Sequence, residues 1–69
     1  MIDNEEIVVE LIKMRMNKRL SQRELAELAD ISYSTISRIE RGITSPDIKT
    51  LNKLAYALGV NLIVKFERG

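Results

Sequence analysis

Residues 20–42 read LSQRELAELADISYSTISRIERG, and this stretch holds two short helical patterns on either side of a tight turn. The first pattern opens with Ser21 and has Glu24 three residues later. In such a capping box each side chain accepts a hydrogen bond from the other residue's backbone N–H, so the start of the helix is well defined. The pattern predicts a helix over residues 22–29 whose buried residues are Leu25, Ala26, Leu28 and Ala29.

The turn and the second helix follow directly. Asp30 ends the first helix because aspartate tolerates left-handed backbone better than most residues other than glycine. Ser32 caps a second helix predicted from about Tyr33 to Arg41, and Gly42 stops it. Two helices joined by about three residues form a helix-turn-helix. The exposed face of the second helix then carries phenol, hydroxyl and guanidinium groups: Tyr33, Ser34, Arg38 and Arg41.

A longer helix is predicted ahead of this motif, over residues 4–18. At about 100° per residue its apolar side chains form two adjacent stripes. The stripes are Ile7, Leu11 and Met14 in one and Val9, Ile12 and Met16 in the other. Arg15 falls within the apolar arc, and a buried arginine is costly unless a carboxylate meets it. The pattern therefore predicts a buried carboxylate partner for Arg15 elsewhere in the fold.

One more helix follows the motif, and the tail after it has a different period. Ser45 or Asp47 caps this helix, Gly59 ends it, and its apolar residues repeat at helical spacing: Ile48, Leu51, Leu54, Ala55 and Leu58. The tail at 61–67 alternates instead, which is the spacing of a β-strand.

A single strand leaves its backbone N–H and C=O groups unpaired. We therefore expect the tail to pair antiparallel with its twin across a dyad, with one side of the strand in a shared core: Leu62, Val64 and Phe66. The alternative is a tail that packs on its own domain or is disordered. The predicted organisation is a helical domain over residues 1–60 and a dimerisation segment over residues 61–69.

Composition excludes several classes of function. The chain has 69 residues, of which 45% are hydrophobic, so one domain is expected. Cysteine and histidine are absent from the sequence, which argues against disulfides, the common metal sites and the commonest general base. No apolar run nears the roughly 20 residues of a membrane span, and the first residues are acidic, unlike a secretory signal. We expect a cytoplasmic protein that is not an enzyme and that holds neither cofactor nor metal.

The net charge of +1 is unevenly distributed. Residues 1–10 contain four acids and no base, whereas residues 11–69 contain eleven bases and six acids, a net charge of +5. Five bases follow one another with no acid between them: Lys13, Arg15, Lys18, Arg19 and Arg23. Such a cluster suits an anionic partner. A solvated basic helix end is the alternative.

Three stretches resemble the phage-repressor (Xre/Cro) helix-turn-helix family: residues 20–42, Ser45-Pro46 and the sequence LAYALGV at 54–60. The resemblance covers about residues 8–60. It implies a mainly α fold, a compact bundle of four helices of the lambda repressor-like DNA-binding type, to which the tail adds a short C-terminal β-strand. Asp30 departs from the glycine that the family usually has in the turn, which leaves the geometry of the turn open.

The resemblance also implies which residues meet DNA. The helix that begins at Tyr33 would enter the major groove and bring four side chains to base edges: Tyr33, Ser34, Thr35 and Arg38. Arg38 is the main reader, because one guanidinium can bond both O6 and N7 of guanine. Five residues would bind the phosphate backbone, with Lys18 and Arg19 as more distant candidates: Gln22, Ser32, Thr44, Ser45 and Lys49.

Three side chains keep alternative roles. In the family, an arginine at the place of Arg15 pairs with the glutamate before the helix end, here Glu40, and this structural ion pair supplies the carboxylate that Arg15 needs. Direct contact of Arg15 with phosphate is the alternative. Tyr33 either reaches DNA or packs over its own helix. Arg41 is either a solvated charge at the helix end or a reader of bases.

These features predict a sequence-specific DNA-binding transcriptional regulator, a repressor that binds a palindromic operator as a homodimer. The alternative is an antitoxin of a toxin–antitoxin pair, which binds a toxin and represses its own operon. The wide apolar surface of the helix at 4–18 is where such a toxin could dock. No small-molecule effector is expected, because no second domain is present to bind one.

Overall fold

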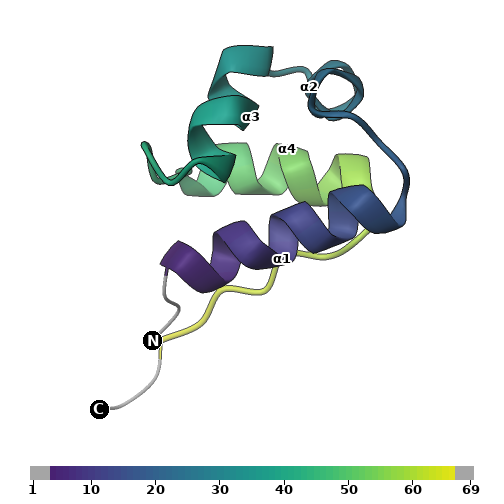
Figure 1. Ribbon diagram of the computed structural model, residues 1–69. Helices are drawn as coiled ribbons and strands as arrows, with labels where there is room; N and C mark the ends of the chain where they lie inside the picture. The colour runs from purple at the N-terminus through teal and green to yellow at the C-terminus, as the bar shows by residue number, and fades with distance from the viewer. Residues whose placement is uncertain (1–3, 67–69) are drawn as a thin grey trace.

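A computed structural model describes residues 4–66, which form a bundle of four helices (Figure 1). The helices are α1 (Asn4–Asn17), α2 (Gln22–Ala29), α3 (Tyr33–Glu40) and α4 (Ile48–Leu58). α2 packs against both α3 and α4, and α3 also packs against α1. The mainly α fold and the helix-turn-helix over α2 and α3 are as predicted. None of the described helices is long and apolar enough to cross a membrane.

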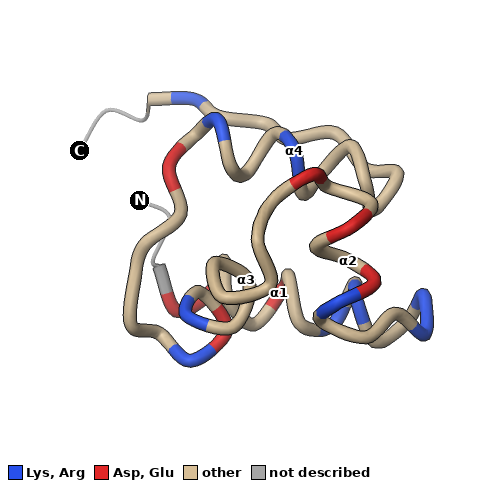
Figure 2. The backbone as a smooth tube through the Cα atoms, turned by 90° about the horizontal axis from the view of Figure 1, so that it is seen from above, with Lys and Arg blue, Asp and Glu red and all other residues tan. Residues whose placement is uncertain are grey.

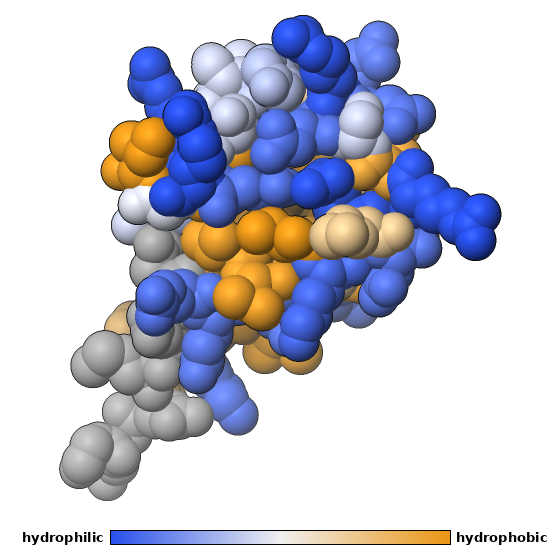
Figure 3. Space-filling view, in the orientation of Figure 1, coloured by the Kyte–Doolittle hydropathy of each residue, from blue (hydrophilic) through white to orange (hydrophobic). Residues whose placement is uncertain are grey.

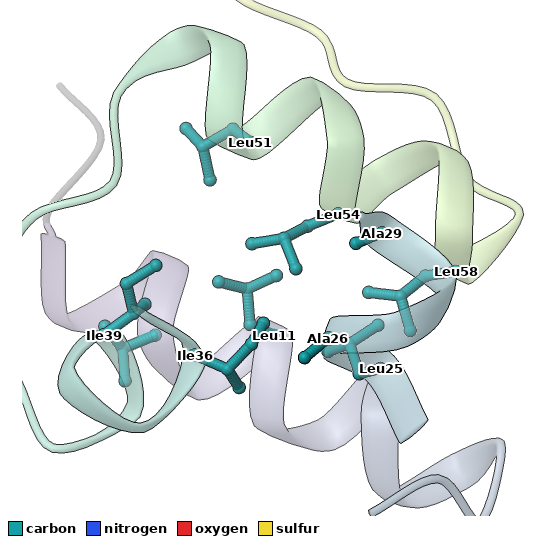
Figure 4. Packing of buried hydrophobic residues seen from close by; sticks show 10 residues of the cluster. Leu11, Leu25, Ala26, Ala29, Ile36, Ile39, Leu51, Leu54 and Leu58 are labelled. Carbon is teal, nitrogen blue, oxygen red and sulfur yellow. The ribbon is translucent and has the colours of Figure 1, made fainter. Parts of the chain in front are cut away.

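The core lies where the four helices meet. Its most deeply buried side chains are at most 2% exposed: Leu25, Ile36, Ile39, Leu54 and Leu58. Figure 4 shows these side chains converging from α2, α3 and α4, with Leu11 of α1 closing the cluster from the opposite side. Because α3 contributes Ile36 and Ile39 to this core, its other face is held outward in a fixed orientation.

Side-chain caps define the starts of three helices. Ser21 Oγ accepts a hydrogen bond from the Glu24 N–H at 3.0 Å, and a Glu24 carboxylate oxygen accepts one from the Ser21 N–H at 2.9 Å. This is the predicted capping box. Ser32 Oγ accepts from the Thr35 N–H at 3.2 Å at the start of α3. Asp47, and not Ser45, caps α4, because its Oδ1 accepts from the Thr50 N–H at 2.7 Å.

Hydrogen bonding at two of these caps stabilises a charged carboxylate. The backbone N–H and then the hydroxyl of Ser21 lower the pKa of Glu24 below its ordinary value. The side chain and then the backbone N–H of Thr50 lower the pKa of Asp47 in the same way. The cap of α3 is the hydroxyl of Ser32. A carboxylate therefore takes part in the caps of α2 and α4 but not in the cap of α3.

The turn between α2 and α3 forms with aspartate at the position where the family usually has glycine. Asp30 has φ 56° and ψ 47°, which is left-handed backbone, and its N–H bonds to the carbonyls of Ala26 and Glu27. Ile31 follows and is partly buried against the core. A non-glycine residue in this conformation costs about 1–2 kcal/mol, less for aspartate than for most residues. The turn therefore keeps the helix-turn-helix geometry despite the departure at Asp30.

One apolar residue predicted to be buried is exposed. Leu28 is 58% exposed because it lies roughly 100° round the helix from the centre of the buried face formed by Leu25, Ala26 and Ala29. The prediction for Leu28 was wrong. Ile48, the first residue of α4 and of its apolar repeat, is 53% exposed, whereas Leu51, Leu54, Ala55 and Leu58 are buried.

The second apolar stripe of α1 also lies largely in solvent. Val9 is 48% exposed and Met16 63% exposed, whereas Ile12 is partly buried. Figure 3 shows hydrophobic surface across the middle of this face of the molecule, over α1 and surrounded by hydrophilic residues. Of the second stripe, only Ile12 therefore packs against the core, which α1 contacts mainly through Val8 and Leu11.

The predicted C-terminal β-strand is not formed in the described part of the tail, residues 60–66. Leu62 is partly buried and packs on the core, where it lines a groove together with Leu11 and Leu51. Ile63 and Val64 are 74% and 56% exposed, so the expected alternation of buried and exposed residues breaks there. A strand needs a neighbouring strand for its backbone hydrogen bonds, and within residues 4–66 none is present. Glu67, the last residue of the predicted strand, lies outside the described residues.

Candidate nucleic-acid interface

A cluster of hydroxyl groups marks the N-terminal end of α3. Ser32 Oγ lies 2.7 Å from Thr35 Oγ1 and 3.2 Å from Ser34 Oγ. Ser32 and Ser34 are exposed, whereas Thr35 is half-buried. The structure therefore brings these three predicted DNA-binding residues together, and it engages the Thr35 hydroxyl in the cap.

Tyr33 lies beside this cluster and stacks on α2. The guanidinium carbon of Arg23 lies 4.1 Å from the centroid of the Tyr33 ring, and 40% of Tyr33 is exposed. Tyr33 therefore packs against the neighbouring helix of the motif and not over its own helix. Sequence reasoning included Arg23 in the basic cluster but gave it no site of its own, because nothing in the spacing indicates that Arg23 and Tyr33 meet.

The two arginines toward the other end of α3 differ in their surroundings. Arg38 is exposed, and its guanidinium makes no hydrogen bond or ion pair with the other described residues. Arg41 is also exposed, but its Nε donates to the Ser37 carbonyl at 3.3 Å. Of the two, Arg38 has the side chain whose donors are all available to a ligand.

The remaining predicted phosphate contacts lie on the loop before α4 and on its first turn. Thr44, Ser45 and Lys49 are all exposed. Figure 2 shows that the basic residues are spread over the molecule, beyond α2 at one end, beside α3, and along α4 and the tail. Charge alone would not have located a single binding face.

Arg15 and Glu40 connect α1 to the end of α3. Arg15 Nε donates to Glu40 Oε2 at 2.7 Å and Arg15 Nη2 donates to Oε1 at 2.9 Å, while Nη1 donates to the Leu20 carbonyl at 2.8 Å. The side chains are 15% and 7% exposed. This bidentate pair supplies the hydrogen-bond acceptors and the counter-charge that the Arg15 guanidinium needs within the apolar arc of α1. The role of the pair is therefore structural.

Gln22 joins the same network. Its Nε2 donates to Glu40 Oε1 at 3.0 Å, and the residue is half-buried. A residue expected at the phosphate backbone is thus tied to the ion pair beneath it, with its amide oxygen and second N–H still available. Sequence spacing gave no sign of this bond, because the two residues are far apart in the chain.

The described residues offer no metal site of the usual kind, since no group of three or more of their acidic side chains is gathered. What the surface does offer is an oriented set of hydroxyl, phenol and guanidinium groups around the start and outer face of α3. Such groups donate hydrogen bonds to phosphate oxygens and to base edges.

The profile of a protein family described as helix-turn-helix matches residues 11–64. An uncharacterized HTH-type transcriptional regulator of Haemophilus influenzae is 38% identical over 58 residues, which are 84% of this chain and 59% of that protein. The HTH-type transcriptional regulator PuuR of Escherichia coli is 44% identical over 52 residues, which are 75% of this chain and 28% of PuuR. The immunity repressor protein of Bacillus phage phi105 is 39% identical over 49 residues, 71% of this chain and 34% of that protein. The chain therefore spans less than two thirds of each of these relatives.

Proposed function

We propose a repressor function for this chain, which belongs to the Xre/Cro-type helix-turn-helix family of DNA-binding transcriptional regulators. In this proposal it binds a palindromic operator as a dimer, with α3 in the major groove of each half-site. The observation that carries the proposal is the outer face of α3, which the core holds outward with the Arg38 guanidinium unengaged within residues 4–66.

Base edges are read from α3 in this proposal. Arg38 bonds guanine in a bidentate manner, which discriminates strongly among bases, whereas hydroxyl groups can serve several bases and discriminate weakly. The other readers are Tyr33, Ser34 and Thr35. Thr35 contributes least to base reading, because the residue is half-buried and its hydroxyl is engaged with Ser32 in the cap.

Contacts with the phosphate backbone flank these readers. Gln22 and Ser32 lie at the starts of α2 and α3, while the other three lie around the start of α4: Thr44, Ser45 and Lys49. Contacts of this kind fix the register of a protein on DNA without selecting a sequence. One side-chain N–H of Gln22 already donates to Glu40. The second side-chain N–H is available to donate to a phosphate oxygen, whereas the amide oxygen can only accept hydrogen bonds.

The first prediction separates reading from positioning. Arg38→Ala is expected to lose about 1–3 kcal/mol of binding free energy on a preferred duplex and to relax the preference at one base pair. Lys49→Ala is expected to weaken binding evenly across sequences. Gel shifts over a panel of duplexes, selected by the wild-type protein from a random pool, measure both effects. If neither change alters binding to any duplex, the proposed docking of α3 is wrong.

The dimer is proposed to form through the tail. A single helix in one groove selects sequence weakly, and two-fold dimers bind half-sites about 34 Å apart. Leu62 anchors the tail on its own core, while Val64 and Phe66 stay exposed. Those two exposed apolar residues are available to a second copy of the chain.

The second prediction tests this dimer. Deleting residues 61–69 is expected to give a monomer in sedimentation, because the shared apolar contact is lost. Since Leu62 also packs on the core, the matched variant is the double change Val64→Ser and Phe66→Ser, which keeps that anchor. An unchanged dimer mass in both variants would remove the tail from the proposal.

A second candidate function is that of an antitoxin, which the exposed apolar surface of α1 favours. Val9 and Met16 are 48% and 63% exposed, which suits contact with another protein. Coexpression with the product of the neighbouring gene tests this function. A complex that the double change Val9→Ser and Met16→Ser disrupts would support it, and the lack of any complex would count against it.

A further inference from the structure

We propose that Arg23 is an additional DNA-binding residue, which contacts a backbone phosphate while its stack on Tyr33 holds both side chains in place. The inference rests on the proposed function, since it names a further contact of the same DNA-binding surface. It assigns to α2 a contribution beyond its packing against α3 and α4.

Both members of the pair are adjacent in sequence to residues predicted to contact DNA. Arg23 directly follows Gln22 on α2, and Tyr33 directly precedes Ser34 on α3. The distance of 4.1 Å from the guanidinium carbon to the ring centroid is that of a cation–π contact. Both residues are exposed, so a ligand at the surface can reach them together.

The stack leaves the hydrogen-bonding capacity of Arg23 free. Stacking occupies the face of a guanidinium, whereas its five N–H donors lie in the plane. No hydrogen bond or ion pair within residues 4–66 occupies those donors. Glu27 lies one turn further along α2 without pairing with Arg23, and Glu24 is engaged by Ser21. The structure thus holds an oriented cation that forms no ion pair within residues 4–66, while Glu27 and Asp30 line the same open hollow.

A phosphate is the anion that fits this arrangement. Two parallel N–H groups on one edge of a guanidinium match two phosphate oxygens, and the pair of bonds is charge-assisted. An arginine already oriented by stacking gives up less side-chain freedom when it binds than a free one does. The same stack restricts Tyr33, so the phenol of the predicted reader depends on the residue beside it.

The third prediction concerns salt dependence. A duplex selected by the wild-type protein from a random pool serves as the probe, and an unrelated duplex of equal length serves as the comparison. Arg23→Ala is expected to reduce affinity about tenfold on both duplexes and to make the slope of log K against log salt shallower by about 0.9. Fluorescence anisotropy at several salt concentrations measures both quantities.

Matched variants separate a phosphate contact from a structural role. Arg41→Ala removes an exposed arginine that bonds its own helix, and it is expected to leave the slope unchanged. Tyr33→Phe keeps the ring and should keep the slope. In a protein that already carries Tyr33→Ala, the loss of affinity caused by Arg23→Ala should be about two- to fivefold smaller than in the wild type. Thermal unfolding of the Arg23→Ala, Arg41→Ala and Tyr33→Phe variants should match that of the wild type, because Arg23 and Arg41 are exposed and Tyr33→Phe keeps the ring.

The outcomes distinguish this inference from the proposed function. If Arg38→Ala weakens binding but Arg23→Ala changes neither affinity nor slope, the assignment of Arg23 is overturned and the repressor proposal stands. If the effects of Arg23→Ala and Tyr33→Ala simply add, the stack does not couple the two residues and that part is overturned. If the wild-type protein selects no duplex at all, the proposed function fails, and the Arg23 assignment fails with it.

Discussion

Replacing Glu40 with alanine is expected to lower the free energy of unfolding by about 3–5 kcal/mol. The Glu40 carboxylate accepts hydrogen bonds from Arg15 Nε, Arg15 Nη2 and Gln22 Nε2. Its removal leaves the guanidinium of Arg15, a side chain that is only 15% exposed, without its counter-charge. Domains of this size have a free energy of unfolding of about 3–10 kcal/mol, so the variant is expected to be partly unfolded at moderate temperature. Urea unfolding followed by circular dichroism measures the loss.

Two further variants define the cause of that loss. Glu40→Gln keeps an amide oxygen as acceptor and should lose less than Glu40→Ala, because part of the network survives. The double variant Arg15→Ala and Glu40→Ala should lose less than the sum of the single changes, because no charge is then left unpaired. Additive losses, or a loss below about 1 kcal/mol for Glu40→Ala, would show that the pair has no more weight than a surface ion pair.

Replacing Leu54 with alanine is expected to lower the free energy of unfolding by about 2–5 kcal/mol. Leu54 is 1% exposed and lies at the centre of the cluster in Figure 4, where α4 meets α2 and α3. The change removes buried apolar surface and leaves a cavity that rigid neighbours fill only in part. Urea unfolding on the same scale as for Glu40 allows the two losses to be compared.

Leu28→Ala is the matched control for this change. Leu28 has the same side chain but is 58% exposed, so its loss is expected to stay within about 0.5 kcal/mol. Equal losses for the two leucines would mean that Leu28 is covered in solution, for instance by a second copy of the chain. They would then contradict the burial described for α2.

Local signals explain why the motif could be predicted from sequence. Ser21, Glu24 and Ser32 bond backbone groups within three residues of themselves, so the starts of α2 and α3 follow from short spacings. Asp30 likewise ends α2 through its own backbone conformation. In each case the residues that set the structure are neighbours in the chain.

The conformation of the tail and the exposure of Leu28 could not be predicted from the sequence. A β-strand depends on hydrogen bonds to a second strand, and alternation at Leu62, Val64 and Phe66 does not say whether one exists. The burial of Leu28 depended on which face of α2 the other helices cover. Hydrophobicity of a side chain does not state which neighbours will reach it.

In the candidate site, too, some contacts could be predicted from the sequence and others could not. The need for a carboxylate near Arg15 follows from its place among apolar residues, and the resemblance named Glu40 as that partner. The bond from Gln22 to Glu40 and the stack of Arg23 on Tyr33 connect residues on different helices through their rotamers. Only packing determines such contacts, and they supplied the residue on which the further inference rests.

The caps described for the three helix starts make the protein respond unevenly to acid. The pKa values of Glu24 and Asp47 are lowered in the fold, so their stabilising effect is complete above the ordinary pKa of a carboxyl group. It fades as the pH falls below that value and is lost once the pH passes the lowered pKa. Ser32 does not titrate in this range, so its cap is unaffected. Acidification therefore removes the Glu24 half of the α2 capping box, where the Ser21 hydroxyl still caps, and weakens the Asp47 cap of α4, whereas the cap of α3, the helix proposed to read DNA, is unchanged.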